Sequence, residues 1–289
     1  MTALLVCCGL ATLDVVQVVD RLPAADEKVV AERLDVTFGG PAANAAATAV
    51  ALGVRTVLVT ALGTGPVADL VRAGLGAAGV EVVDLLDGPG TPPVSTVLVT
   101  RGTGERAVVS VNAVGVRDLS GAAGRLDVLD GATALLVDGH HLGAAQVLAA
   151  AARDLPVLLD GGSWKPGLDG LLAHVDHAVL SADFRLPDDG ADDLLDRVAE
   201  LGPQLVAQSA GGGSVRILVV GPQGRRLSVL QPPRIPASEV VDTLGAGDVL
   251  HGATAASLAQ GHDVLSALAD GIARASESVR YPGALGWVP

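Results

Sequence analysis

The hydrophobic and polar positions along the chain follow one dominant pattern. Short, continuous apolar runs that end in glycine or polar residues alternate with alanine-rich segments. Such runs are typical of strands buried on both faces of a parallel sheet. The segment GPAANAAATAVALG, with Pro41 near its first turn and Gly53 after its end, predicts one of the helices. The pattern predicts a doubly wound α/β fold with a mainly parallel central sheet, whose strands include ATALLVDGHH, LPVLLDGGS, DHAVLSADF and SVRILVVGPQG.

Two blocks of strand-like sequence stand apart from this pattern. In the first, residues 14–38, the apolar side chains between Val30 and Phe38 keep one parity, as in a half-buried strand. The second, residues 94–112, predicts a hairpin that turns at RGTGER. Together the blocks predict a small sheet outside the main domain. Because a small sheet with one apolar face is not stable alone in water, we expect it to cover a ligand, a second copy of the chain, or both.

Length and composition favour one large domain. The chain has 289 residues, a size that doubly wound folds reach as one unit, so we expect a single domain over residues 1–289. Hydrophobic residues make up 49% of the chain and aromatic residues only 2%, which predicts a core of tightly packed Ala, Val and Leu. The stretch AQSAGGGS is interpreted as a flexible glycine-rich loop.

Charge and cysteine content narrow the partners and the compartment. A formal net charge of −13 argues against nucleic acids and membrane surfaces as partners, because both require clustered Lys and Arg. The only cysteines, Cys7 and Cys8, are adjacent and are expected to be core thiols in a reducing compartment. The apolar run near the N-terminus is too short for a membrane span and lacks a basic flank. These features predict a cytoplasmic protein.

Polar residues follow several of the predicted strands. Asp138, His140, Asp160 and Ser181 are therefore expected at one edge of the sheet, where ligands of open α/β folds bind. His140 is interpreted either as a strand-end residue that contacts a ligand or as an ordinary loop histidine. The pair His140 and His141 has no further Cys, Glu or His at the spacing of a zinc site.

The segment DTLGAGD predicts an anion-binding turn. Gly245 and Gly247 permit a tight turn with exposed N–H groups, and the helix that follows adds its positive end. Asp248, where that helix begins, is interpreted either as a helix cap or as an acid that acts on a group beside the anion.

A second glycine pair strengthens the alternative that Asp248 acts on a ligand. Gly39 and Gly40 are followed by Asn44, which alone would be an ordinary polar residue in an alanine-rich helix. The glycine pair and Asn44 at this spacing, together with the later aspartate-bearing turn DTLGAGD, form a much more specific pattern than any of these residues alone. By contrast, GLGAAG at residues 74–79 matches a dinucleotide fingerprint only in spelling, because it follows a helical run instead of a strand.

These motifs resemble the ribokinase (PfkB-type) family of carbohydrate kinases. The resemblance covers nearly the whole chain, through CGLATLDVVQVVDRLP, FGGPAANAAATAVALG and VVDTLGAGDVLHGA, and is nearest to the ketohexokinase and sulfofructose kinase branches. It implies a ribokinase-like three-layer α/β fold with a small β-sheet lid at about residues 14–38 and 94–112. It also implies transfer of the γ-phosphoryl group of ATP, with Mg²⁺, to a sugar hydroxyl. Because a small sheet with one apolar face is not stable alone, we also expect a homodimer that pairs through the lid.

The resemblance implies roles for particular residues. Asp248 is expected to take the proton from the sugar hydroxyl, and Gly245, Ala246 and Gly247 are expected to form the anion hole. This agrees with the chemistry, because phosphoryl transfer depends mainly on positioning and charge stabilisation, and a nearby carboxylate can accept the proton. The residues expected to meet the sugar are Asp14, Gly39, Gly40 and Asn44. Those expected to meet the nucleotide include Ser181, Thr243 and Gly245.

The sequence departs from the family pattern in two places. Where the family often has Asn-x-x-Glu, which helps to hold magnesium and phosphate, this chain has SADF, with Ser181 and Phe184 at those places. The nucleotide loop is altered to QSAGGG at residues 208–213, where Gly211 and Gly213 are the expected contacts. These departures leave a catalytically weak sugar-binding regulator as an alternative, whereas the retained Asp248 favours an enzyme.

Three further residues bear on the choice of sugar. Lys28, Asn112 and His140 fall where the resembling sulfofructose kinases place groups that meet the anionic tail of their sugar. His140, however, occupies a place where an arginine is expected, and a neutral imidazole does not replace a bidentate guanidinium. The sequence therefore favours a neutral ketose or similar polyol over a sulfonated or otherwise acidic sugar.

Overall fold

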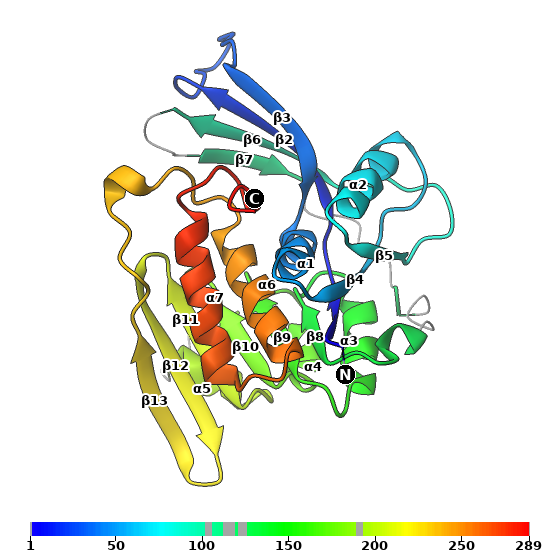
Figure 1. The fold of residues 1–289 in the computed structure, drawn as a ribbon, viewed down its shortest axis with the longest axis vertical. Coiled ribbons are helices and arrows are strands. Elements are labelled where there is room, and N and C mark those ends of the chain that lie inside the picture. The colour runs from blue at the N-terminus through cyan, green and yellow to red at the C-terminus, as the bar shows by residue number, and fades with distance from the viewer. Residues whose placement is uncertain (1, 102–105, 112–118, 121–125, 189–192, 289) are drawn as a thin grey trace.

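The computed structural model describes residues 2–101, 106–111, 119–120, 126–188 and 193–288, and its largest feature is a nine-stranded sheet (Figure 1). The strand order is β13-β12-β11-β10-β9-β8-β1-β4-β5, and neighbours from β5 to β11 run parallel. This confirms the predicted α/β fold with a mainly parallel sheet. The strands are β1 (Leu4–Cys8), β4 (Arg55–Thr60), β5 (Glu81–Asp84), β8 (Ala134–Val137), β9 (Val157–Gly161), β10 (His177–Leu180), β11 (Leu205–Ala210), β12 (Gly213–Gly221) and β13 (Gly224–Leu230).

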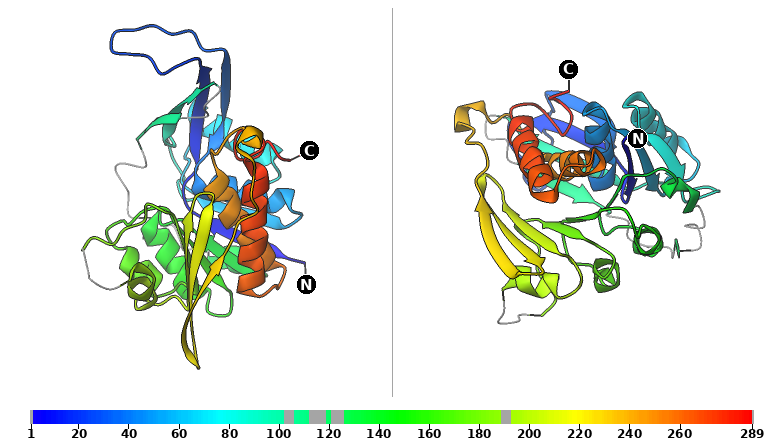
Figure 2. Two further views of the ribbon diagram at one scale, coloured as in Figure 1. Left: turned by 90° about the vertical axis from the view of Figure 1, so that its left-hand side faces the viewer. Right: turned by 60° about the horizontal axis from the view of Figure 1, so that its bottom comes forward.

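Helices cover both faces of this sheet and give three layers (Figures 1 and 2). Side chains alternate along the central strand β1, so Leu5 and Cys7 enter one core while Val6 and Cys8 enter the other. The first core lies under α1 (Pro41–Ala51), α2 (Pro66–Ala77), α6 (Ala246–Ala259) and α7 (Val264–Ser278). The second lies under α3 (Leu142–Ala151), α4 (Leu168–Leu172) and α5 (Leu194–Ala199). Short 3₁₀ turns, η2 (Leu126–Leu129) and η3 (Ala237–Glu239), occur in the connections.

Two expectations about the far edge of the sheet are wrong. The run that contains β12 was expected to be another parallel strand, but it pairs antiparallel with β11 and β13. The stretch AQSAGGGS was expected to be a flexible loop, but its first half belongs to β11, which pairs with both β10 and β12. The reason is that Gly211 and Gly212 connect β11 to β12 directly, and so short a turn joins only antiparallel strands.

A separate four-stranded sheet stands beside the main sheet (Figures 1 and 2). Its order is β3-β2-β6-β7, with β2 (Thr12–Val19), β3 (Arg33–Gly39), β6 (Val94–Thr100) and β7 (Arg106–Ser110). β6 and β7 form the predicted hairpin, and the small second sheet is confirmed. Val30, however, lies outside β3 and is 81% exposed, so its assignment to a half-buried strand is wrong. Within β3, Leu34 and Val36 share a face but are also exposed, and only Phe38 of this set is buried, so the strand is not half-buried along its length.

The two cysteines behave as expected of core residues. Cys7 and Cys8 are buried and unpaired, and burial raises the pKa of both thiols. A thiol with a raised pKa forms little reactive thiolate near neutral pH, so both residues act as small apolar side chains. Of the helices in the described part of the chain, none combines the length and the hydropathy that a membrane span requires.

Candidate active site

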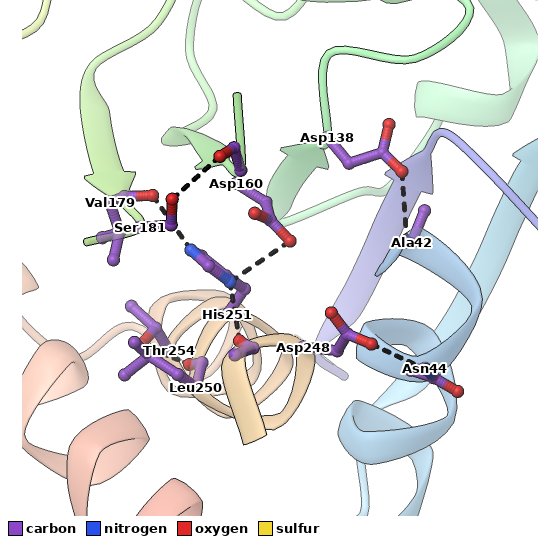
Figure 3. Close-up of polar contacts among 12 residues, drawn as sticks. Ala42, Asn44, Asp138, Asp160, Val179, Ser181, Asp248, Leu250, His251 and Thr254 are labelled. Atoms are coloured by element: carbon purple, nitrogen blue, oxygen red, sulfur yellow. Dashed lines mark hydrogen bonds and ion pairs between the residues drawn. The ribbon is translucent and has the colours of Figure 1, made fainter. Parts of the chain in front are cut away.

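The candidate site lies where the carboxyl ends of β8, β9 and β10 meet the first turns of α1 and α6 (Figure 3). Asp138 follows β8, Asp160 lies in β9, and Ser181 follows β10, as the pattern of strand ends predicts. Asn44 comes from α1 and Asp248 from the first turn of α6. The fold therefore brings together the two glycine motifs that lie far apart in the sequence.

Asn44 and Asp248 are in direct contact. The Asn44 Nδ2 donates a hydrogen bond of 2.7 Å to the Asp248 Oδ2. Burial, together with the nearby Asp160 carboxylate, raises the pKa of Asp248 to about 7, although the hydrogen bond from Asn44 opposes this shift. A carboxylate with such a pKa can accept a proton near neutral pH and release it again, as a general base must.

Asp248 is not the cap of its helix. The N-cap of α6 is Gly245, and no side chain caps this helix end. The carboxylate of Asp248 instead accepts its hydrogen bond from Asn44 on another helix. The interpretation of Asp248 as a helix cap is therefore wrong, and its action on a ligand stays a prediction.

The raised pKa of Asp248 predicts the pH dependence of turnover. A base must be deprotonated to accept a proton, so kcat should be constant above about pH 7 and fall about tenfold per pH unit below it. Direct quantification of released ADP between pH 5 and 9 would measure this profile. A profile that stays flat down to pH 5 would contradict the assignment of Asp248 as the base.

The turn before α6 has the geometry of an anion cradle. Gly245 has φ of 75°, in the left-handed region that glycine adopts without strain, and Ala246 N donates to Thr243 O. The next N–H groups, including that of Gly247, lie in the first turn of α6 and so have no partner inside the helix. Together with the positive end of the helix they favour a phosphate at this position.

The first glycine pair shapes the opposite side of the site. Gly40 is the N-cap of α1 with φ of 96°, and a Cβ there would lie 2.5 Å from the Leu10 carbonyl oxygen. A Cβ on Gly39 would overlap the carboxylate of Asp14, which extends from the lid strand β2. Asp14 accepts a hydrogen bond of 2.6 Å from Thr12 Oγ1, and burial raises its pKa. The pair thus lets the lid carboxylate approach the start of α1.

Asp138 organises the backbone of the site. It accepts hydrogen bonds from the backbone N–H groups of Leu10 at 2.8 Å, Ala42 at 3.2 Å and His140 at 2.8 Å. Although burial opposes it, the His140 side chain and these N–H groups hold the pKa of Asp138 well below its usual range. The His140 Nδ1 lies 3.2 Å from the Asp138 Oδ1, so this histidine is anchored beside the site. Its contact with a substrate stays a prediction.

The other predicted residues are distributed as follows. Lys28 is exposed in the connection between β2 and β3. This connection lies at the end of the small sheet away from the main sheet (Figure 1). Asn112 lies outside the described residues. Gly211 and Gly213 lie at the β11–β12 turn, and Thr243 directly precedes the anion cradle. The structure therefore does not bring Lys28 to Asp248, and the nucleotide contacts stay predictions.

Two residues at the site were missed by sequence reasoning. Arg106 of the lid strand β7 donates a hydrogen bond of 2.8 Å to Thr243 Oγ1, which places a cation beside the anion cradle. His251, one turn beyond Asp248 in α6, lies 3.2 Å from the Asp160 carboxylate. Neither residue is part of a recognisable sequence motif, because the partner of each, Thr243 or Asp160, is far away in the sequence. Only the position of His251, three residues after Asp248 on a predicted helix, indicated a shared helix face.

The described residues do not form a cage for a metal ion. They contain no group of three or more His, Cys, Asp or Glu side chains arranged to hold one. At the place where the family motif has an acid, Phe184 is fully buried and packs edge-on against Trp164. Ser181 donates its hydroxyl hydrogen bond to the Gly162 carbonyl oxygen at 2.8 Å. Both positions of this motif are thus committed to contacts within the protein.

Comparisons with known proteins identify the family and the fold of the chain. A ribokinase from Arabidopsis thaliana is 26% identical over 301 residues, covering 99% of this chain and 78% of that protein. A ketohexokinase from Mus musculus is 26% identical over 289 residues, covering 91% of this chain and 92% of that protein. The structure of Arabidopsis thaliana ribokinase complexed with ribose and ATP superposes with a TM-score of 0.75 at 23% identity, covering 100% of this chain and 96% of that one, and so shares the fold. The family model described as pfkB family carbohydrate kinase matches residues 2–289. The chain belongs to the pfkB family of carbohydrate kinases.

Proposed function

We propose that the protein transfers the γ-phosphoryl group of ATP to a hydroxyl group of a small, neutral sugar, as a single domain over residues 1–289. The observation that carries this proposal is the half-buried Asp248 carboxylate, held by Asn44 beside the free N–H groups at the start of α6. A base and an anion cradle at one point are what phosphoryl transfer to an alcohol requires.

The chain's own residues account for the steps of this transfer. Asp248 accepts the proton from the sugar hydroxyl while the oxygen of that hydroxyl forms a bond to the γ-phosphorus of ATP. The bond from that phosphorus to the bridging oxygen breaks, and ADP leaves with the electron pair. The N–H groups of Gly247 and its neighbours, with Arg106 from the lid, stabilise the negative charge on the transferring group. Asp14, Gly39, Gly40 and Asn44 hold the sugar between the lid and α1.

The structure fits ATP better than it fits a resident metal. The cradle before α6 is open, since a Cβ on Gly247 would meet no atom within 4 Å, and the Gly211–Gly212 turn is equally open. These features leave room for phosphates and a nucleotide. Magnesium is proposed to arrive with ATP, supplying charge to its phosphates and keeping water ligands, because Mg²⁺ commonly binds through phosphates and few carboxylates.

The charges around the site favour a neutral sugar over an acidic one. Asp14 and Asp248 are the carboxylates expected beside the sugar, and they would repel an anionic tail. Lys28, the cation expected to meet such a tail, is exposed at the far end of the lid. His140 is anchored to Asp138. We therefore favour a ketose or similar polyol.

A sugar panel tests the proposed function. ADP release would be measured with ATP and fructose, other neutral sugars and sulfofructose, with Asp248→Asn as the control for contaminating kinases. We expect turnover with a neutral ketose. If sulfofructose is preferred by more than tenfold in kcat/KM, the neutral-sugar proposal is wrong. If no sugar supports turnover but calorimetry detects sugar binding, the protein is a sugar-binding regulator instead.

We also propose that the lid pairs with the lid of a second copy. The strand register places Leu34, Val36 and Val109 on one face of the lid, opposite to the face of Asp14, and they are 60%, 52% and 74% exposed. An apolar face of this kind on a thin sheet favours burial against a partner.

A charge on this face should separate the two copies. We expect Val36→Asp to convert a dimer to a monomer at micromolar concentration, because burying a carboxylate in an apolar interface is costly. Light scattering over a range of concentrations would measure this. Val30→Asp, at an exposed position outside the sheet, is the matched control and should leave the dimer intact. A wild-type monomer at every concentration would contradict the proposal.

We propose a cytoplasmic location. The two free thiols, Cys7 and Cys8, suit a reducing compartment, and the proposed reaction consumes ATP. Fractionation of cells that produce the native protein would test this.

A further inference from the structure

His251 has an unusual set of contacts for a buried histidine. It belongs to α6, one turn after Asp248, and its side chain is only 6% exposed. Its Nδ1 lies 2.7 Å from the Gly247 carbonyl oxygen and 3.2 Å from the Asp160 Oδ2. Its Nε2 lies 3.0 Å from the Val179 carbonyl oxygen (Figure 3). Both ring nitrogens therefore face oxygen atoms, two of which are backbone carbonyls.

These contacts decide how many protons the ring carries. A backbone carbonyl oxygen can only accept a hydrogen bond, so each ring nitrogen must donate one. A neutral imidazole carries a single N–H, and one of its nitrogens would then direct a lone pair at a carbonyl oxygen at 2.7 or 3.0 Å. A protonated Asp160 would not remove this conflict. It could donate a hydrogen bond to an unprotonated Nδ1, but that nitrogen would still have no hydrogen to donate to the Gly247 carbonyl oxygen.

The charged groups around His251 come from two strand ends and from its own helix. Asp160 on β9 lies closest, Asp138 follows β8 with His140 beside it, and Asp248 precedes His251 on α6. Burial is the largest effect and lowers the pKa of His251 overall, although the two carbonyl contacts and the carboxylates oppose this shift. Burial and the Asp138 carboxylate raise the pKa of Asp160, which opposes an ion pair. Both shifts oppose the ion pair, so the argument for a doubly protonated ring rests on the two carbonyl contacts, each of which needs an N–H donor.

We propose that His251 is held as an imidazolium, with the Asp160 carboxylate as its counter-ion, and that it positions the anion cradle and Asp248. Its two N–H donors link the Gly247 carbonyl at the start of α6 to the Val179 carbonyl in β10. The first turn of α6 is thereby fixed against the edge of the main sheet. The positive charge lies beneath the cradle, where the positive helix end already favours an anion.

The same charge tunes the proposed base. His251 lowers the pKa of Asp248, in opposition to burial and to the Asp160 carboxylate. Without the imidazolium, Asp248 would hold its proton to higher pH and be a weaker catalyst near neutrality. This use of the charge rests on the proposed function, whereas the protonation state of His251 does not.

NMR spectroscopy of the ligand-free protein tests the proposal without any substrate. In protein labelled with ¹⁵N on histidine, the six histidines would be assigned by substitution, with His251→Gln removing the signals in question. We expect both ring nitrogens of His251 to be protonated at pH 7.5, where a free histidine is neutral. One unprotonated ring nitrogen at this pH would overturn the proposal.

A second readout tests the positioning role. Carboxyl ¹³C titration should show the midpoint of Asp248 about one pH unit higher in His251→Gln than in the wild type, the scale of losing one neighbouring charge. His174→Gln, at an exposed position, is the matched control and should leave this midpoint unchanged. An unchanged midpoint in His251→Gln would overturn the positioning role. If that variant does not fold, Asp160→Asn replaces it, and His251 should then lose its charge at lower pH than in the wild type.

These measurements separate the two proposals. If the sugar panel fails while both nitrogens of His251 are protonated and the Asp248 midpoint shifts, the proposed function falls and this inference stands. If sugars are phosphorylated while His251 is neutral, the proposed function stands and this inference falls.

Discussion

Replacing Asp248 with asparagine is expected to lower turnover roughly 100-fold or more, the usual scale of a lost general base. The substitution keeps the shape of the side chain, and its Oδ1 can still accept the hydrogen bond from Asn44. It removes only the ability to take a proton from the sugar hydroxyl. Because that proton moves in the transition state, kcat should fall while the affinity for sugar and ATP changes little.

The measurement needs to separate lost chemistry from lost structure. Asp248 is half-buried, and burial and the Asp160 carboxylate raise its pKa, so removing its charge should leave the melting temperature at pH 8 unchanged or raise it. Asp263→Asn is the matched control, because Asp263 caps the next helix by accepting hydrogen bonds from Leu265 N and Ser266 N. It should cost about 1 kcal/mol of stability at most and keep turnover. Near wild-type turnover in Asp248→Asn would show that another group accepts the proton.

The architecture of this protein could be predicted because its signals are local. Each buried run, such as Ala134–Val137, carries its own pattern, and the prolines that begin helices and the glycines that end them act within a few residues. The direction of β12 could not be predicted in this way. A short apolar run has the same sequence pattern in a parallel and in an antiparallel strand. Only the two-residue connection at Gly211 and Gly212 indicates that β12 runs antiparallel to β11.

The candidate site was predictable to the extent that its parts occur in motifs. Asn44 and Asp248 each stand beside a glycine turn, and the fold joins them by a hydrogen bond. Arg106 could not be found, because it contacts Thr243 across 137 positions of sequence and belongs to an ordinary strand. His251 shows the same limit, since its partners Asp160 and Val179 come from two other strands. Contacts of this kind are determined by strand order and register, which no short pattern records.

Gly245→Ala is expected to lower turnover on the order of 10- to 100-fold through the geometry of the cradle alone, because a displacement of about 1 Å at a reacting centre can cost that much. Gly245 has φ of 75°, and a Cβ there would lie 2.4 Å from the Cβ of Ala284, so the turn must shift. Gly261→Ala is the matched control at the other end of α6: its φ is 91°, but a Cβ would meet nothing within 4 Å. Both variants should lose about 1 kcal/mol of stability to left-handed strain, and only Gly245→Ala should lose turnover. Equal turnover in the two variants would show that the backbone before α6 does not hold the transferring phosphate.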